Sequence, residues 1–169
     1  LLREAVEGSH DIVGRHEIVL EAEDADTPVN VDARLLGRVL RHLLENAARY
    51  SPPESKIVLK CKPLTDRLEF AVIDHGIGMD AADLPFIFEK FYRGRKATRH
   101  GKGTGMGLAI VRALLRAHGG AIQAAATPGK GTTMTFWVPL EAGVAADQPG
   151  IQEAVQSAIK GSSRRKAPI

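Results

Sequence analysis

The chain has 169 residues, of which 44% are hydrophobic and 25% charged, the balance found in soluble globular proteins of one domain. The net charge of +3 comes largely from two short basic stretches, and no aromatic residues interleave the C-terminal one, so no nucleic-acid partner is expected. The single cysteine, Cys61, excludes an internal disulfide and a Cys-rich zinc site. No apolar run is long enough to span a membrane, and a cytoplasmic location is expected.

The first third of the chain predicts a helix, a strand and a second helix. Apolar residues at helical spacing predict a helix over 1–13, and alternation predicts a short strand over 18–22. Asp32 is a good N-cap for a helix that runs to about Tyr50, since its side chain can accept from free backbone N–H groups. The helix must end at 51–53 (Ser-Pro-Pro), because proline cannot continue the hydrogen-bond ladder.

The rest of the chain predicts two hairpins with one helix between them. Alternating residues predict strands over 56–62 and 67–73, then a helix over 106–118, and finally strands over 121–126 and 132–139. Strands that pair as hairpins indicate an α+β two-layer sandwich, with helices on one face of a mixed, mostly antiparallel sheet.

The segments between these elements differ in composition. Residues 74–79 are glycine-rich, a short turn of helix is expected over 80–84, and 93–105 form a basic, glycine-rich loop that we expect to be mobile. We place the domain over 1–141. The tail, 142–169, is expected to be mostly disordered.

Three glycines in the segment that opens the 106–118 helix favour anion binding. Gly103, Gly105 and Gly107 let backbone N–H groups approach an anion, and a helix N-terminus adds free donors and partial positive charge. The alternative is a flexible hinge. The Gly-Lys-Ser/Thr ending of a Walker A motif is absent.

Asp74, Gly76 and Gly78 follow a predicted strand. An aspartate at such a place is ordinarily a turn former or a cap. As a hydrogen-bond acceptor, the Asp74 carboxylate could instead bind the amino group of adenine and disfavour guanine, which presents a carbonyl there.

Asn46 lies on the apolar stripe of the 33–50 helix that contains Leu43. A polar amide on such a stripe either satisfies a buried partner or faces a ligand. Its carbonyl oxygen suits Mg²⁺, which otherwise keeps waters and phosphate oxygens. The residue alone leaves both readings open.

Taken together, these segments resemble the catalytic domain of bacterial sensor histidine kinases. Residues 42–50 look like the N box of that family, 74–79 like the first glycine box, 85–92 like the F box and 103–107 like the second glycine box. Residues 131–139 resemble the last strand of the family, and the resemblance covers about residues 1–140.

The resemblance implies a Bergerat ATP-binding fold with ATP and Mg²⁺ as cofactors. Asp74 would bind adenine, with Thr132 supporting it through water. Asn46 would coordinate Mg²⁺, Arg49 would approach the phosphates, and Asn46 and Arg49 would be the catalytic residues. Tyr50 would line the nucleotide pocket. Residues 93–105 would be the ATP lid. The remaining expected nucleotide-binding residues are Gly76, Gly78, Gly103, Thr104, Gly105, Gly107 and Leu108.

One position departs from the family pattern. The N box commonly carries an asparagine where His42 stands, and related hydrolysing ATPases carry a glutamate there. Because His42 is not a carboxylate base, phosphotransfer is favoured over hydrolysis. His42 could contact Mg²⁺ or simply pack, and packing is the expected role. Glu45 could substitute as a base but points about a quarter-turn away from Asn46.

His10 precedes Asp11, as an acceptor histidine precedes an acidic residue in this family. The helical hairpin that should separate an acceptor histidine from the N box is absent, so His10 is expected to be a surface histidine.

The resulting expectation is transfer of the γ-phosphate of Mg·ATP to a histidine on a separate dimerisation domain of the same parent protein, which works with a response regulator. The parent would be a homodimer and could be membrane-bound. Two alternatives stay open. One is an anti-sigma-type serine kinase, in which the F box and lid are mostly shortened. The other is a nucleotide-binding module without catalysis.

Overall fold

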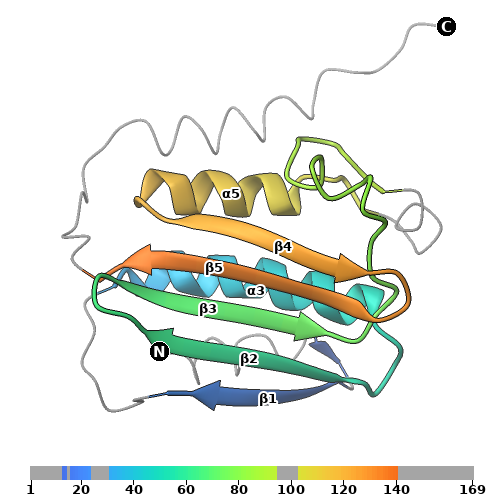
Figure 1. The fold of residues 1–169 in the computed structure, drawn as a ribbon, viewed down its shortest axis with the longest axis horizontal. Coiled ribbons are helices and arrows are strands. Elements are labelled where there is room, and N and C mark those ends of the chain that lie inside the picture. Colours follow the sequence, from blue (N-terminus) through green and yellow to red (C-terminus); the bar gives the residue numbers. More distant parts are fainter. Residues whose placement is uncertain (1–12, 15, 24–30, 95–102, 141–169) are drawn as a thin grey trace, which may run out of the picture.

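The protein is described by a computed structural model over residues 13–14, 16–23, 31–94 and 103–140 (Figure 1). Its elements, in chain order, are β1 (Glu17–Ala22), α3 (Ala33–Tyr50), β2 (Lys56–Pro63), β3 (Arg67–Asp74), α5 (Gly107–Ala117), β4 (Ala121–Thr127) and β5 (Gly131–Pro139). Among the described residues, no helix is both long and apolar enough to cross a membrane.

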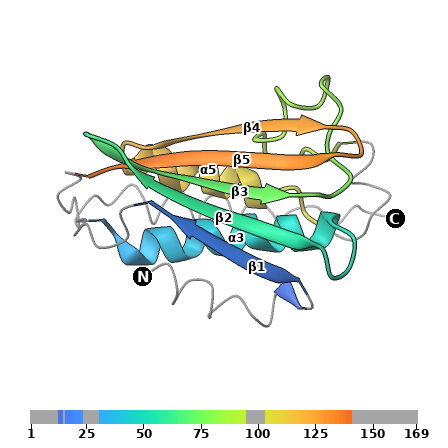
Figure 2. The same cartoon turned by 60° about the horizontal axis from the view of Figure 1, so that its bottom comes forward.

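The five strands form one sheet in the order β1-β2-β3-β5-β4. β1 runs parallel to β2, while the other three pairs of neighbours are antiparallel. Both helices cover the same face of this sheet, as the two views in Figures 1 and 2 show. The expected α+β two-layer sandwich with a mixed, mostly antiparallel sheet is therefore confirmed.

Helix α3 begins and ends where its local sequence predicts. Oδ1 of Asp32 accepts hydrogen bonds from the backbone N–H groups of Arg34 (2.8 Å) and Leu35 (3.1 Å), which satisfies two free donors of the first turn. Ser51 is the C-cap, directly before the two prolines. The buried stripe that faces the sheet consists of Leu35, Leu36, Val39, Leu40, Leu43, Leu44 and Ala47.

The helix-facing side of the sheet is apolar until it reaches the end of β3. Alternate residues of β3 are buried, and the Phe70 ring stacks on Phe136 of β5 with ring centres 4.8 Å apart. Asp74 is the next buried residue in the same alternation after Val72. The strand periodicity thus directs one carboxylate into the layer between sheet and helices, at the end of the core.

One expected element differs from the structure, and others cannot be compared. Residues 80–92 contain no helical segment but a run of tight turns, in which the N–H groups of Asp83, Phe86 and Glu89 each bond to the carbonyl three residues earlier. Only every third backbone N–H forms such a bond, so the N–H groups between them do not continue the hydrogen-bond pattern of a helix. We call 80–92 the turn segment. The expectations for 1–12, the central part of the lid (95–102) and the tail from 142 lie outside the described residues.

Candidate nucleotide-binding site

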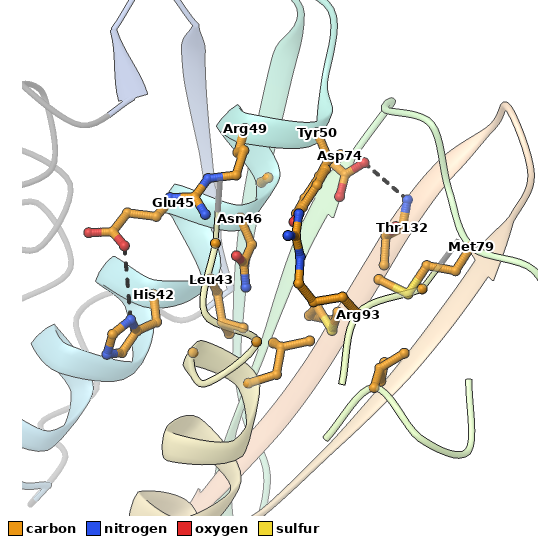
Figure 3. Close-up of a pocket in the computed structure, with 18 of the residues that line it drawn as sticks. His42, Leu43, Glu45, Asn46, Arg49, Tyr50, Asp74, Met79, Arg93 and Thr132 are labelled. Carbon is orange, nitrogen blue, oxygen red and sulfur yellow. Dashed lines mark hydrogen bonds and ion pairs between the residues drawn. The ribbon is translucent and has the colours of Figure 1, made fainter. Parts of the chain in front are cut away.

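A cavity of about 290 Å³ opens between α3, the end of β3, the turn segment and the N-terminus of α5 (Figure 3). Among the residues expected from the sequence, those that line it are Asn46, Arg49, Tyr50, Asp74, Gly78, Gly103, Thr104, Gly105, Gly107, Leu108 and Thr132. Gly76 does not line the cavity. Its backbone N–H instead bonds to Asp74.

Asp74 forms one end of the cavity and is only 8% exposed. Its Oδ1 accepts the backbone N–H of Gly76 at 2.8 Å. The same atom accepts the backbone N–H of Thr132 at 3.1 Å (Figure 3). Its Oδ2 has no hydrogen-bond partner within the described part of the chain. Burial raises the pKa of the Asp74 carboxyl, while the two backbone hydrogen bonds act in the opposite direction. The result is a buried acceptor with one oxygen fixed and one available to a donor in the cavity.

Close backbone packing holds the glycines around Asp74. A Cβ on Gly76 would overlap the carbonyl of Tyr50, to which the N–H of Ile77 donates at 3.0 Å. Gly78 has φ +60°, and a Cβ there would overlap the carbonyl of Thr127. The segment after β3 therefore passes between the end of α3 and the end of β4 with no room for side chains at these two positions.

At the other end of the cavity, α3 faces the second glycine segment. A Cβ built on Gly103 would lie 3.1 Å from Nη1 of Arg49, and one built on Gly107 would lie 4.0 Å from Nδ2 of Asn46. Met106 supplies no side-chain cap to α5, so within the described part of the chain the first-turn N–H groups of this helix have no side-chain acceptor. Uncapped N–H groups, a guanidinium and an amide together form an environment for a phosphate chain.

The donors near Asn46 fit a Mg²⁺ ion held mainly by phosphate oxygens. The described residues contain no cluster of three or more His, Cys, Asp or Glu side chains that could hold a metal alone. Asn46 offers one amide oxygen at the cavity wall. Mg²⁺ is commonly bound in this way, through one or two protein ligands with water and phosphate completing the coordination.

His42 lines the cavity and does not simply pack into the core. Its Nδ1 lies 3.9 Å from the carboxylate of Glu45, and each side chain is 31% exposed (Figure 3). Burial lowers the pKa of His42, and the Glu45 charge opposes that shift. The packing role that the sequence suggested for His42 is therefore incomplete, since its ring is also accessible from the cavity.

The turn segment contributes Asp83, which the sequence did not single out, and it leads into Arg93, the first residue of the expected lid. Asp83 lines the cavity, and one of its oxygens accepts the hydroxyl of Tyr92 at 2.7 Å. Arg93 also lines the cavity (Figure 3). The N–H of Phe91 donates to the carbonyl of Gly105 at 3.1 Å and so joins the two ends of the 93–105 loop. The aromatic cluster marked this segment, but no periodicity linked Asp83 to Tyr92.

Comparison with known proteins agrees with this geometry. A family profile described as "Histidine kinase-, DNA gyrase B-, and HSP90-like ATPase" matches residues 31–142. The chain belongs to this family. The match includes every element that lines the cavity, so the Bergerat-type resemblance inferred from the four boxes is confirmed.

Within this ATPase family, the similar curated proteins are sensor histidine kinases. The chain is 38% identical to sensor histidine kinase WalK of Bacillus subtilis over 73% of its length and 21% of that protein. It is 36% identical to sensor-like histidine kinase SenX3 of Mycobacterium tuberculosis, over 76% of its length and 34% of that protein. The chain thus spans about a fifth to a third of these two relatives and corresponds to their catalytic ATPase domain.

Solved structures show the same architecture. The mycobacterial sensor histidine kinase MprB matches with a TM-score of 0.71 and 28% identity, over 82% of this chain and 92% of that one. Full-length ShkA, solved in complex with AMPPNP, matches with a TM-score of 0.70 and 27% identity, over 85% of this chain and 30% of that one.

Proposed function

We propose that this chain binds Mg·ATP and transfers the γ-phosphate to a histidine on a separate dimerisation domain of the same parent protein, with 1–141 forming the ATP-binding domain. The observation that carries the proposal is that the two ends of the cavity differ in chemistry. A buried acceptor, Asp74, lies at one end, and an uncapped helix N-terminus with Asn46 and Arg49 lies at the other.

Adenine recognition is assigned to the Asp74 end. The Oδ2 atom of Asp74 would accept the amino group of adenine, while Oδ1 stays bonded to Gly76 and Thr132. Guanine would place a carbonyl against this acceptor, so ATP is selected over GTP. Thr132 supports the contact through its own backbone bond to Asp74, and a water on its hydroxyl would add to it.

Phosphate binding is assigned to the other end. Arg49 would neutralise phosphate charge, and Asn46 would bind the metal through its amide oxygen. When bound, Mg²⁺ supplies charge neutralisation between the phosphate groups. The N–H groups of 103–108 would orient the phosphates in line with an acceptor, which is the main requirement of phosphoryl transfer.

Transfer is favoured over hydrolysis by the groups next to Asn46. Activation of water needs a base, and His42 stands where the related hydrolysing ATPases carry a glutamate. Glu45 in turn is one position away from the stripe that carries Asn46. The proton-accepting group for transfer to a histidine belongs to the acceptor domain.

The relatives' names as sensor histidine kinases support the remaining partners. We propose that the parent is a homodimeric, cytoplasmically exposed sensor that could be membrane-bound, and that a response regulator receives the phosphate. The ShkA complex with AMPPNP supports ATP as the nucleotide.

Two measurements test the proposal. Titration with ATP and Mg²⁺ should show micromolar binding, about −7 to −8 kcal/mol. Incubation with radiolabelled ATP and a supplied histidine-containing dimerisation domain should then give acid-labile, alkali-stable phosphate on that domain. Labelling of a serine instead would favour the anti-sigma-type kinase. ATP binding without transfer to any supplied acceptor would favour a regulatory nucleotide-binding module.

A further inference from the structure

Arg112 connects α5 to the turn segment outside the nucleotide cavity. Its Nη2 lies 3.0 Å from Oε1 of Glu89, in an ion pair whose side chains are 28% and 57% exposed. Its guanidinium carbon lies 5.9 Å from the centre of the Phe88 ring, within the range of a cation–π contact. Arg112 is not among the residues that line the cavity.

The two elements joined by Arg112 are the two walls at the phosphate end of the cavity. The turn segment leads to Tyr92 and Arg93, and α5 begins at Gly107, all three of which line the cavity. The backbone bond from Phe91 to Gly105 joins these walls, and Ile87 and Phe88 are buried in the same hydrophobic core as Val111 of α5. Apolar packing is not directional, whereas the ion pair of Arg112 adds a directional contact that fixes the relative orientation of the walls.

We propose that Arg112 is a positioning residue for phosphate binding. By holding α5 to Glu89 and Phe88, it fixes the direction in which the free N–H groups of the first turn of α5 point. This inference rests on the proposed function, since it requires the phosphates of ATP to bind at that helix terminus.

The effect is local to one end of the cavity. A partly exposed ion pair contributes little to global stability. The adenine end depends on Asp74 and Thr132, which belong to β3 and β5 and are held by their own hydrogen bond. Loss of the Arg112 contacts therefore weakens recognition of phosphates and leaves recognition of adenine intact.

The test compares ATP with adenosine in the full chain. Arg112→Ala should weaken Mg·ATP binding about three- to tenfold, leave adenosine binding unchanged in competition with a fluorescent ATP analogue, and leave the thermal midpoint close to that of the wild type. Arg116→Ala is the matched control, because Arg116 lies one turn further along α5 and is exposed. It should bind both ligands as the wild type does.

Charge exchange separates the ion pair from a general effect of truncation. Glu89→Arg alone should weaken ATP, the double variant E89R/R112E should recover most of the affinity, and Arg112→Lys should be intermediate. Equal losses for ATP and adenosine, or no recovery in the double variant, would overturn the positioning role. If the wild type binds ATP and R112A binds it with the same affinity, this inference alone is overturned. A wild-type chain that binds no ATP overturns the proposed function as well.

Discussion

The Oδ1 atom of Asp74 accepts the backbone N–H of Thr132 at 3.1 Å, which joins the last residue of β3 to the second residue of β5. The same atom accepts the N–H of Gly76 at 2.8 Å. Both donors meet one oxygen, so the other oxygen has no partner among the described residues, and Asp74 lines the cavity. An asparagine at position 74 could keep the two backbone hydrogen bonds on its amide oxygen. It would place an NH₂ group where the second carboxylate oxygen of Asp74 lies.

Asp74→Asn should separate binding from stability. With its oxygen on the two backbone donors, the asparagine would present an NH₂ group to the amino group of adenine, and a donor would face a donor. We expect ATP affinity to fall about 10- to 150-fold, the range for losing a hydrogen bond to a charged group. The thermal midpoint should stay level or rise, because a buried charge is removed. Calorimetric titration and thermal unfolding measure the two effects, and wild-type affinity in the variant would remove adenine recognition from Asp74.

If Asp74 binds adenine as proposed, its raised pKa should make ATP binding weaken at acid pH. A protonated carboxyl is a poorer acceptor, so affinity should weaken as pH falls through this pKa, at a higher pH than for an exposed aspartate. The contribution to folding has the opposite sign. Since the folded pKa exceeds the unfolded one, the folded state binds the extra proton between the two values, and the Asp74 contribution to stability declines as pH rises through that window.

The Asp74→Asn variant is the control for both pH effects. Affinity and thermal midpoint are measured over a pH series in each protein, and the difference between the two proteins isolates the part due to Asp74. Parallel pH profiles for wild type and variant would assign the titration to another group, including the nucleotide itself.

Asn46→Ala should reduce ATP affinity far more in the presence of Mg²⁺ than in EDTA, because the proposed role of the lost group is to bind the metal and not a phosphate. Asn46→Asp keeps an oxygen at the same position and should retain metal-dependent binding. Titrations with and without Mg²⁺ measure the difference. Equal losses in both conditions would give Asn46 a structural role only.

Gly131→Ala should be strongly destabilising. Gly131 has φ +100°, and a Cβ there would overlap the carbonyl of Asp74. Gly129 in the same turn is the control, since it also has a positive φ of +75° but nothing within 4 Å of an added Cβ. We expect a cost of about 1 kcal/mol for Gly129→Ala and more than about 3 kcal/mol for Gly131→Ala, measured by chemical denaturation. Similar costs at both positions would show that the turn relaxes without disturbing Asp74.

Local signals in the sequence predicted much of this structure. Asp32 and the prolines after Ser51 identified both ends of α3, because caps and breakers act on neighbouring residues. The alternation of β3 predicted the strand, although its last member, Asp74, was placed in the cavity only by the resemblance. Alternation also predicted β1, but the side chains of a strand do not encode which strand it joins or in which direction.

Contacts without a periodic pattern were not predictable from the residues. Asp83 meets the Tyr92 hydroxyl across a series of turns, and Arg112 meets Glu89 across 23 positions between two different elements. The accessible position of His42 is of the same kind. Its place on α3 was clear, but the direction of its ring depends on Glu45 and on how closely α5 approaches.

Asp74 and Thr132 are 58 positions apart in the chain, and the adenine end of the cavity exists only where they meet. A ribosome must therefore deliver β5, the last strand of the described sheet, before the chain can recognise adenine. Asn46, Arg49 and the second glycine segment (103–107) emerge before that strand. Under the proposed roles of these residues, the growing chain carries its phosphate-binding groups before base selectivity exists, and discrimination between nucleotides begins only when the sheet is completed.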